Sequence, residues 1–198
     1  YKYDDDSQGR VQAFVDHYLA SGGARPGLIE FLNTLEDWQK RGQIGQVVIY
    51  TAANNNKGWV TFLKECFEVY AGTPGLLGDC LCREQCELVK TKNGTSVYKK
   101  DLAKVANGFR VVIFDDKPEC ITNGITISLP AYRQAVDTKA LEEWVKARIP
   151  MHSSLIANAL ENDRINYPGS DVDQSQDNAL CDGLQLLATV TGDSNYWP

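Results

Sequence analysis

The stretch Val111-Val112-Ile113-Phe114-Asp115-Asp116-Lys117-Pro118 decides the fold of this chain. Its four consecutive apolar residues favour a strand that is buried on both faces. Two carboxylates follow, and Pro118 prevents simple continuation of the strand. Because unpaired buried carboxylates are costly, Asp115 and Asp116 predict a bound cation, and Mg²⁺ suits carboxylates combined with a substrate phosphate. The alternative interpretation is a strand that ends in a solvated acidic turn.

Length, composition and charge narrow the class of protein. The chain has 198 residues, of which 43% are hydrophobic, so it can form one ordinary domain with an appended segment. Its net charge of −6 argues against a nucleic-acid-binding surface, which needs a basic face. No apolar run approaches the roughly 20 residues that span a bilayer. The sequence therefore predicts a globular domain that binds no nucleic acid and has no membrane span, and it leaves the oligomeric state open.

The six cysteines have two interpretations. Cys80, Cys82 and Cys86 lie close together in the sequence, which is one half of a zinc-binding pattern. No second pair is evident, and His17 and His152 are remote from the cluster. We therefore favour buried free thiols in a reducing compartment, which predicts an intracellular protein of the cytoplasm or nucleus.

Hydrophobic spacing predicts alternating helices and strands. Irregular structure is expected over residues 72–96, apart from a short strand within 81–89 and a hairpin turn at 92–94. The expected helices are 11–19, 28–38, 59–67, a short one ending near 107–108, and 139–148; the expected strands are 1–3, 47–50, 111–114 and 125–127.

This order of elements predicts an α/β fold, a three-layer sandwich with a mostly parallel, Rossmann-like sheet. We place the main domain at residues 1–150. Residues 151–198 are expected to form a C-terminal appendage that wraps the domain or docks a partner. Its helical pieces at 153–160 and 180–190 flank an acidic linker over 168–178.

Polar clusters follow three of the expected strands, at the edge where open α/β sheets bind ligands. A basic residue comes from the loop and short helix before the last of these strands. Their convergence is more specific than any one of them. The candidate residues are Asp4 and Asp6, Thr51, Asp115 and Asp116, and the basic Lys100.

Each cluster also has a purely structural interpretation. Thr51 is well suited to be a helix N-cap. Lys100 is next to Asp101 and is equally consistent with a solvated surface pair. The run from Asp4 to Asp6 is consistent with a disordered acidic tail.

At this point the sequence resembles the haloacid dehalogenase superfamily, and within it the RNA polymerase C-terminal-domain phosphatases and their relatives that resemble the NLI-interacting factor. The resemblance covers roughly residues 4–135. The family's first motif is Asp-x-Asp-x-Thr; Asp4 and Asp6 fit its aspartates, and Gln8 stands in place of the threonine. The other segments that carry the resemblance are Arg25–Leu32, Val48–Ala52, Arg83–Cys86, Tyr98–Leu102, Val112–Pro118 and Ile125–Tyr132.

The resemblance implies a phosphomonoesterase with an aspartyl-phosphate intermediate. Asp4 would attack phosphorus, which splits one difficult hydrolysis into two easier steps. Asp6 would protonate the leaving alcohol and then activate the water. Mg²⁺ would be held by Asp4, by the backbone carbonyl of Asp6 and by Asp116, and would offset repulsion between nucleophile and phosphate.

The remaining candidates have supporting roles under the same resemblance. Thr51 would donate a hydrogen bond to a phosphate oxygen, and Lys100 would neutralise charge on the transferring group. Asp115 would orient the groups around the metal. Members of this branch have a minimal cap, so the implied open site suits phosphorylated Ser or Thr in a protein.

Two other functions stay open beside the favoured protein phosphatase. One is a catalytically inactive member of the same fold that serves as a binding or structural subunit of a larger assembly. Gln8, the weak first strand and the tail ending in Tyr196-Trp197 motivate it. The branch includes a mitochondrial import-receptor subunit, which makes mitochondria the second candidate compartment. The other function is a small-molecule phosphatase of the superfamily.

Overall fold

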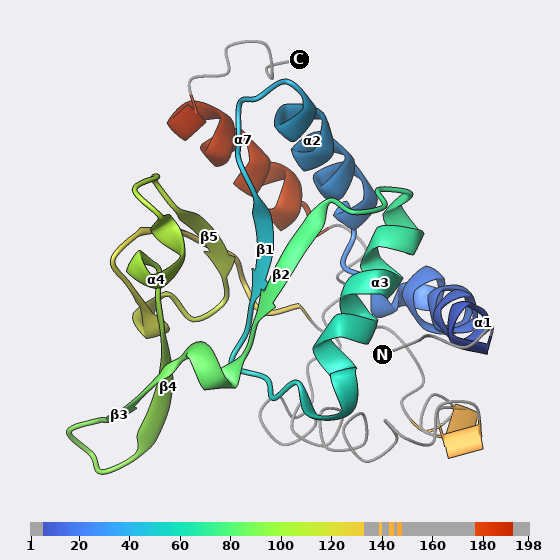
Figure 1. The fold of residues 1–198 in the computed structure, drawn as a ribbon, viewed down its shortest axis with the longest axis horizontal. Coiled ribbons are helices and arrows are strands. Elements are labelled where there is room, and N and C mark those ends of the chain that lie inside the picture. Colours follow the sequence, from blue (N-terminus) through green and yellow to red (C-terminus); the bar gives the residue numbers. More distant parts are fainter. Residues whose placement is uncertain (1–5, 133–138, 140–142, 145, 148–176, 192–198) are drawn as a thin grey trace.

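The structure is a computed structural model that describes residues 6–132, 139, 143–144, 146–147 and 177–191. It confirms an α/β fold built from helices and small sheets (Figure 1). Within the described residues, no helix is both long and apolar enough to cross a membrane.

Within the described residues, the strands form three small sheets. Two of these sheets are parallel pairs, β1 with β2 and β5 with β7, as expected for an α/β fold. The third contains an antiparallel hairpin, β3 and β4, to which β6 adds in parallel. The strands are β1 Val47–Tyr50, β2 Leu77–Leu81, β3 Glu87–Lys90, β4 Ser96–Asp101, β5 Val112–Asp115, β6 Ile121–Thr122 and β7 Ile125–Ser128.

The structure confirms the helices that the sequence predicts at 11–19, 28–38, 59–67 and 180–190. Apolar residues recur there every three or four positions because one face of each helix is buried. The predicted helix 139–148 is described only in part, and 151–176 lies outside the described residues. The helices are α1 Asp6–Phe14, the π-helical Val15–Gly23, α2 Leu28–Lys40, α3 Trp59–Ala71, α4 Ala103–Ala106 and α7 Ala179–Thr191, with single turns at Asn56–Gly58, Arg83–Gln85 and Pro118–Cys120.

Strand β2 shows that the expectation of irregular structure is wrong over residues 77–81, whereas β3 overlaps the expected short strand and the hairpin turn lies where it was expected. Gly72 and Gly75 do form the turn before it, with φ of +71° and +78°. Gly78, however, lies inside β2, where a Cβ would stand 2.3 Å from Nε2 of Gln46. The end of the Gln46 side chain lies against Gly78, which is paired within the strand and does not mark a break in it.

Two further details of the prediction are wrong. Lys100 lies in strand β4 instead of a loop or helix, because β4 is paired on both sides, with β3 and with β6. Strand β5 is half-buried along its length and not buried on both faces. Within the described residues its partner is β7 alone, so one edge has no neighbouring strand.

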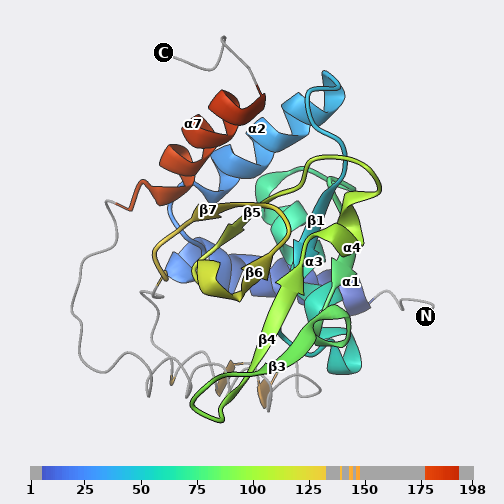
Figure 2. The ribbon, with the colours of Figure 1, turned by 90° about the vertical axis from the view of Figure 1, so that its left-hand side faces the viewer.

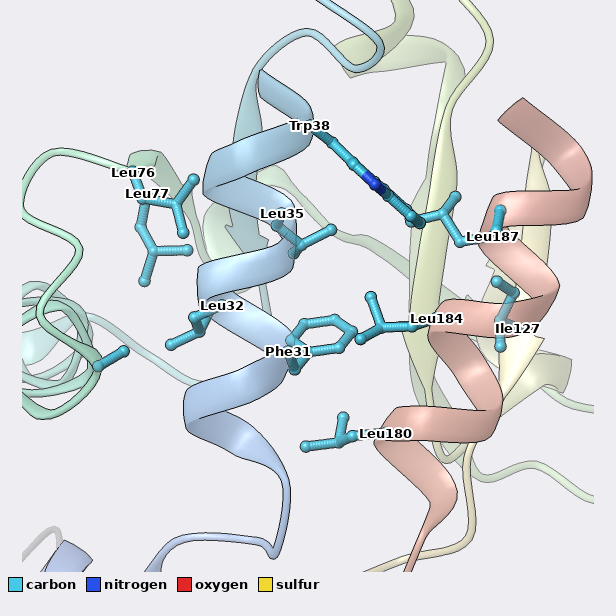
Figure 3. Close-up of a cluster of buried hydrophobic side chains, with 12 residues drawn as sticks. Phe31, Leu32, Leu35, Trp38, Leu76, Leu77, Ile127, Leu180, Leu184 and Leu187 are labelled. Atoms are coloured by element: carbon cyan, nitrogen blue, oxygen red, sulfur yellow. The ribbon is translucent and has the colours of Figure 1, made fainter. Parts of the chain in front are cut away.

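The main core lies between α2, α7 and β7 (Figure 3). Trp38 and Leu184 are each only 1% exposed. The ring of Phe31 meets that of Phe114 edge-on, with centroids 4.9 Å apart, which joins α2 to β5. Gly183 lets α7 approach the same strand, because a Cβ there would stand 2.9 Å from Cε1 of Phe114.

A second cluster of buried side chains joins α1 and the π-helix to α3. Phe14, which is 1% exposed, lies at its centre. The rings of Trp59 and Phe62 meet Phe14 edge-on, with centroids 6.1 and 5.4 Å away. Trp144 is partly buried and packs against this cluster.

A charged contact links the segment before α2 to the start of α7. Nε of Arg25 donates to Oδ2 of Asp177 at 2.8 Å, and the two side chains are 12% and 10% exposed. The other carboxylate oxygen of Asp177 accepts the backbone N–H of Ala179, which satisfies one N–H group at the helix start. The guanidinium also lies 5.8 Å from the ring centroid of Tyr132.

We expect Arg25→Gln to lower the free energy of unfolding by about 2 kcal/mol, because Asp177 keeps a largely buried charge without its partner. Urea denaturation measures this change. Lys40→Gln is the matched control, since Lys40 pairs with Glu36 but its side chain is 68% exposed. The control should cost less than about 0.5 kcal/mol. Equal losses for the two variants would contradict a structural role for the Arg25 pair.

Candidate functional site

An ion pair joins the ends of strands β4 and β5. Lys100, the second-last residue of β4, donates from Nζ to Oδ2 of Asp115, the last residue of β5. Their side chains are only 12% and 8% exposed. Lys100 is therefore not a solvated partner of Asp101, which instead accepts hydrogen bonds from Asn123 and from the backbone N–H of Ala103.

The two neighbouring carboxylates have different environments. Oδ1 of Asp115 accepts the backbone N–H of Lys117 at 2.8 Å, so both of its carboxylate oxygens are engaged. Asp116 is exposed, and its side chain makes no ion pair or hydrogen bond within the described part of the chain. The interpretation as a solvated acidic turn therefore holds for Asp116 and is wrong for Asp115. Asp115 is held in one orientation, and Asp116 is free to bind a ligand.

Thr51 follows strand β1 and begins a tight turn. Its backbone N–H donates to Leu81 O at 2.8 Å, which extends the pairing of β1 with β2. Its side-chain oxygen accepts the N–H of Ala53 at 3.1 Å, and the hydroxyl proton remains available to a ligand. The N-cap of α3 is Gly58, seven residues further on, so Thr51 does not cap that helix.

Cys86 lies beside the backbone of Thr51. Its thiol donates to the backbone oxygen of Thr51 at a sulfur–oxygen distance of 3.8 Å. Burial raises the pKa of the Cys86 thiol, while the ammonium groups of Lys100 and Lys104 and the guanidinium of Arg83 act to lower it. These three cations act on Cys86 together with the carboxylate of Glu84, and Lys100 is paired with Asp115, so positive charge is in slight excess here. This is an electrostatic environment suited to an anion.

Asn55 is a residue of this region that the sequence did not identify. Its Oδ1 accepts the N–H groups of Val60, at 2.8 Å, and Thr61, at 3.3 Å. It thereby satisfies two of the unpaired N–H groups at the start of α3, a helix terminus that follows the Thr51 turn. An asparagine four residues before an apolar periodic segment was the available signal, but the neighbouring asparagines, Asn54 and Asn56, hid it.

The structure does not place the predicted first motif at this site. Asp4 lies outside the described residues. Asp6 is the first residue of α1, and its side chain is not described. Helix α1 packs against α3, and Figure 1 shows β1, β2 and α3 between α1 and β5. The nucleophile Asp4 and the acid–base residue Asp6 therefore stay predictions.

The described residues supply only part of a magnesium site. No group of three or more His, Cys, Asp or Glu side chains gathers in the part of the chain that the structure describes. Asp116 nevertheless offers a free carboxylate beside the fixed Asp115. Mg²⁺ commonly takes one or two carboxylates, several waters and substrate phosphate, so this donor chemistry fits the ion. The ligand set of Asp4, Asp6 and Asp116 stays a prediction.

The fold and the site define an α/β domain with a cationic, hydroxyl-bearing region at the ends of its strands. The family model of NLI interacting factor-like phosphatases matches residues 12–146, and the chain belongs to this family of the haloacid dehalogenase superfamily. Among curated proteins and solved structures, no match was found. The family match confirms the predicted resemblance, and the chain thus carries a phosphatase domain of that type. The matched segment includes Thr51, Lys100 and Asp115 and begins after Asp4 and Asp6.

Proposed function

We propose that this protein is a Mg²⁺-dependent phosphomonoester hydrolase that acts on phosphorylated Ser or Thr of a protein. The observation that carries the proposal is the buried Lys100–Asp115 pair at the ends of β4 and β5, inside the matched family segment that also contains Thr51. A cation fixed in a protein environment stabilises charge on a transferring phosphoryl group more strongly than a solvated one.

Each candidate residue has a separate role in the proposed reaction. Asp4 attacks phosphorus and forms an aspartyl-phosphate, and Asp6 moves the proton to the leaving oxygen and later takes one from water. Thr51 and Lys100 hold the phosphoryl oxygens. Asp115 keeps the Lys100 ammonium in place. A bound Mg²⁺, for which Asp116 supplies a ligand, would offset charge repulsion between phosphate and nucleophile.

We also propose that β1, β2, β5 and β7 belong to one Rossmann-like sheet within a three-layer sandwich, and that the protein is intracellular. The support for the sheet is the parallel pairing of both strand pairs. A minimal cap would leave the strand ends open to a folded or extended protein substrate. A small-molecule phosphatase would instead prefer low-molecular-weight phosphates, which substrate profiling distinguishes.

A non-catalytic binding subunit is the second candidate function, and two observations favour it. The family match begins at residue 12, and α1 lies on the far side of α3 from β5 (Figure 1). If Asp4 and Asp6 stay remote from Asp116, the anion-binding region would persist without a nucleophile. Such a protein would bind a phosphorylated segment and release it unchanged.

Hydrolysis of a phosphoserine peptide by the full chain, with Mg²⁺ and with EDTA, tests the proposed function. We expect turnover that requires Mg²⁺, and a loss of at least about 100-fold in Asp4→Asn. Asp5→Asn removes the same charge one residue away and is the matched control, which should stay within about threefold. Absence of Mg²⁺-dependent turnover, or equal losses in both variants, would overturn the hydrolase and leave the binding subunit.

A further inference from the structure

The β3–β4 hairpin is a basic element in an acidic chain. The hairpin, residues 87–101, contains four lysines and two carboxylates, a net charge of +2, and with its flanks, residues 83–104, the net charge is +3, whereas the whole chain carries −6. Figures 1 and 2 show this hairpin projecting from the rest of the domain. A cationic projection on a protein of opposite net charge indicates an acidic partner.

The strand register defines which side chains share a face of the hairpin. Leu88 lies opposite Tyr98, and Lys90 opposite Ser96. Opposed residues point to the same side of an antiparallel pair, and alternate residues along a strand do too. Lys100 therefore belongs to the same face, which we call the docking face: Leu88, Lys90, Ser96, Tyr98 and Lys100. The docking face leads directly outward from the ion pair at the site.

Two cations are available to a partner, Lys90 on the docking face and Arg83, which covers Tyr98 of that face. Lys90 is exposed and has no ion-pair partner among the described residues. The guanidinium of Arg83 stacks over the ring of Tyr98, 4.8 Å from its centroid, and its Nε donates to Ala52 O at 2.9 Å. Its terminal nitrogens make no hydrogen bond within the described part of the chain. An arginine oriented in this way is suited to bind a carboxylate.

The positions of these cations match the repeat of an extended peptide. Tyr98 is two residues from Lys100 along β4, and the Arg83 guanidinium lies over its ring. Ser96 is four residues from Lys100 and pairs with Lys90 on β3. At about 3.3 Å per residue, these steps are roughly 7 and 13 Å. A bound peptide in extended conformation advances by the same amount, and its alternate side chains point to one side.

We propose that the docking face reads acidic residues at the second and fourth positions from the phosphorylated residue of the substrate. This inference rests on the proposed function, because it places the phosphate next to Lys100. The carboxylate at the second position meets Arg83 above Tyr98, and the one at the fourth position meets Lys90. The partner is thus an extended, acidic phosphopeptide segment.

Two isomeric peptides test the proposal by binding, independently of turnover. Both carry a non-hydrolysable phosphonate analogue of phosphoserine and four glutamates. In one isomer the glutamates occupy the second and fourth positions on each side of the phosphoserine analogue. In the other they occupy the first and third positions on each side. Fluorescence anisotropy with the full chain should show about threefold to tenfold tighter binding of the second-and-fourth isomer. In 0.5 M NaCl the ratio should fall below about twofold, because exposed charge pairs are screened.

Lys90→Gln should weaken binding of the second-and-fourth isomer about threefold and leave the other isomer unchanged. The matched control is Lys99→Gln, which removes the same charge from the opposite face of the hairpin, across from Glu87. That variant should keep the full preference between the isomers.

The outcomes separate this inference from the proposed function. If the isomers bind alike, or if Lys90→Gln and Lys99→Gln act alike, the docking face is overturned even when Mg²⁺-dependent hydrolysis is present. If the isomers differ but no hydrolysis occurs, the docking face stands and the hydrolase fails.

Discussion

Lys100→Met is expected to lower kcat/KM for a phosphoserine peptide by about 100-fold to 1000-fold, the usual effect of removing one fixed charge-stabilising group. The physical reason is that a largely buried ammonium, held by Asp115, stabilises the transferring phosphoryl charge without reorganising. Steady-state kinetics with saturating Mg²⁺ measures the loss. A variant that retains activity within about threefold would contradict this role.

A second variant separates chemistry from stability. Lys100→Met leaves Asp115 charged at 8% exposure without its partner, so the single variant is also expected to unfold more easily. The double variant Lys100→Met/Asp115→Asn removes that uncompensated charge and should recover most of the lost stability in urea denaturation. Its activity should stay low, because no cation returns. Recovery of activity in the double variant would mean that Lys100 acts only through stability.

Leu184→Ala is expected to lower the free energy of unfolding by about 3 kcal/mol, within the range of about 2–5 kcal/mol for leucine truncation in a core. Leu184 is 1% exposed and lies between α7 and α2, where Phe31 and Leu180 are also buried (Figure 3). Its loss leaves a cavity that these helices cannot fill by a small shift. Urea denaturation with a two-state fit measures the change.

Leu186→Ala is the matched control on the same helix. Leu186 is 57% exposed, so removing its side chain creates no cavity. Its expected cost is below about 0.5 kcal/mol. Equal costs for Leu184→Ala and Leu186→Ala would show that α7 does not pack as described.

Much of the fold could be predicted because burial imposes a period on the sequence. The stripe Leu28, Phe31, Leu32, Leu35 and Trp38 identified α2; the last four side chains are buried and Leu28 is partly buried. Strand β2 could not be predicted, because Gly78 has no apolar side chain to mark a strand and because the strand forms by pairing with β1, a separate segment of the chain. Pairing between separate segments leaves no local signal.

The sequence predicted which residue types form the candidate site better than it predicted which of these residues contact one another. The motif that ends in Asp115 and Asp116 indicated the end of a strand and a charged partner. That the partner is Lys100 on β4 depends on pairing between residues far apart in sequence, which no local pattern encodes. The capping role of Asn55 was equally hidden, since it depends on the path of the chain between β1 and α3.

The close approach of Gly183 to Phe114 ties the carboxyl end of the chain to the strand that carries the acidic pair. A premature stop codon ahead of Ala179 would remove every α7 side chain that covers this strand, although no catalytic candidate would be lost. Such a truncated product would carry an intact motif on a poorly supported strand. Its inactivity would reflect lost support for the strand rather than a missing catalytic group.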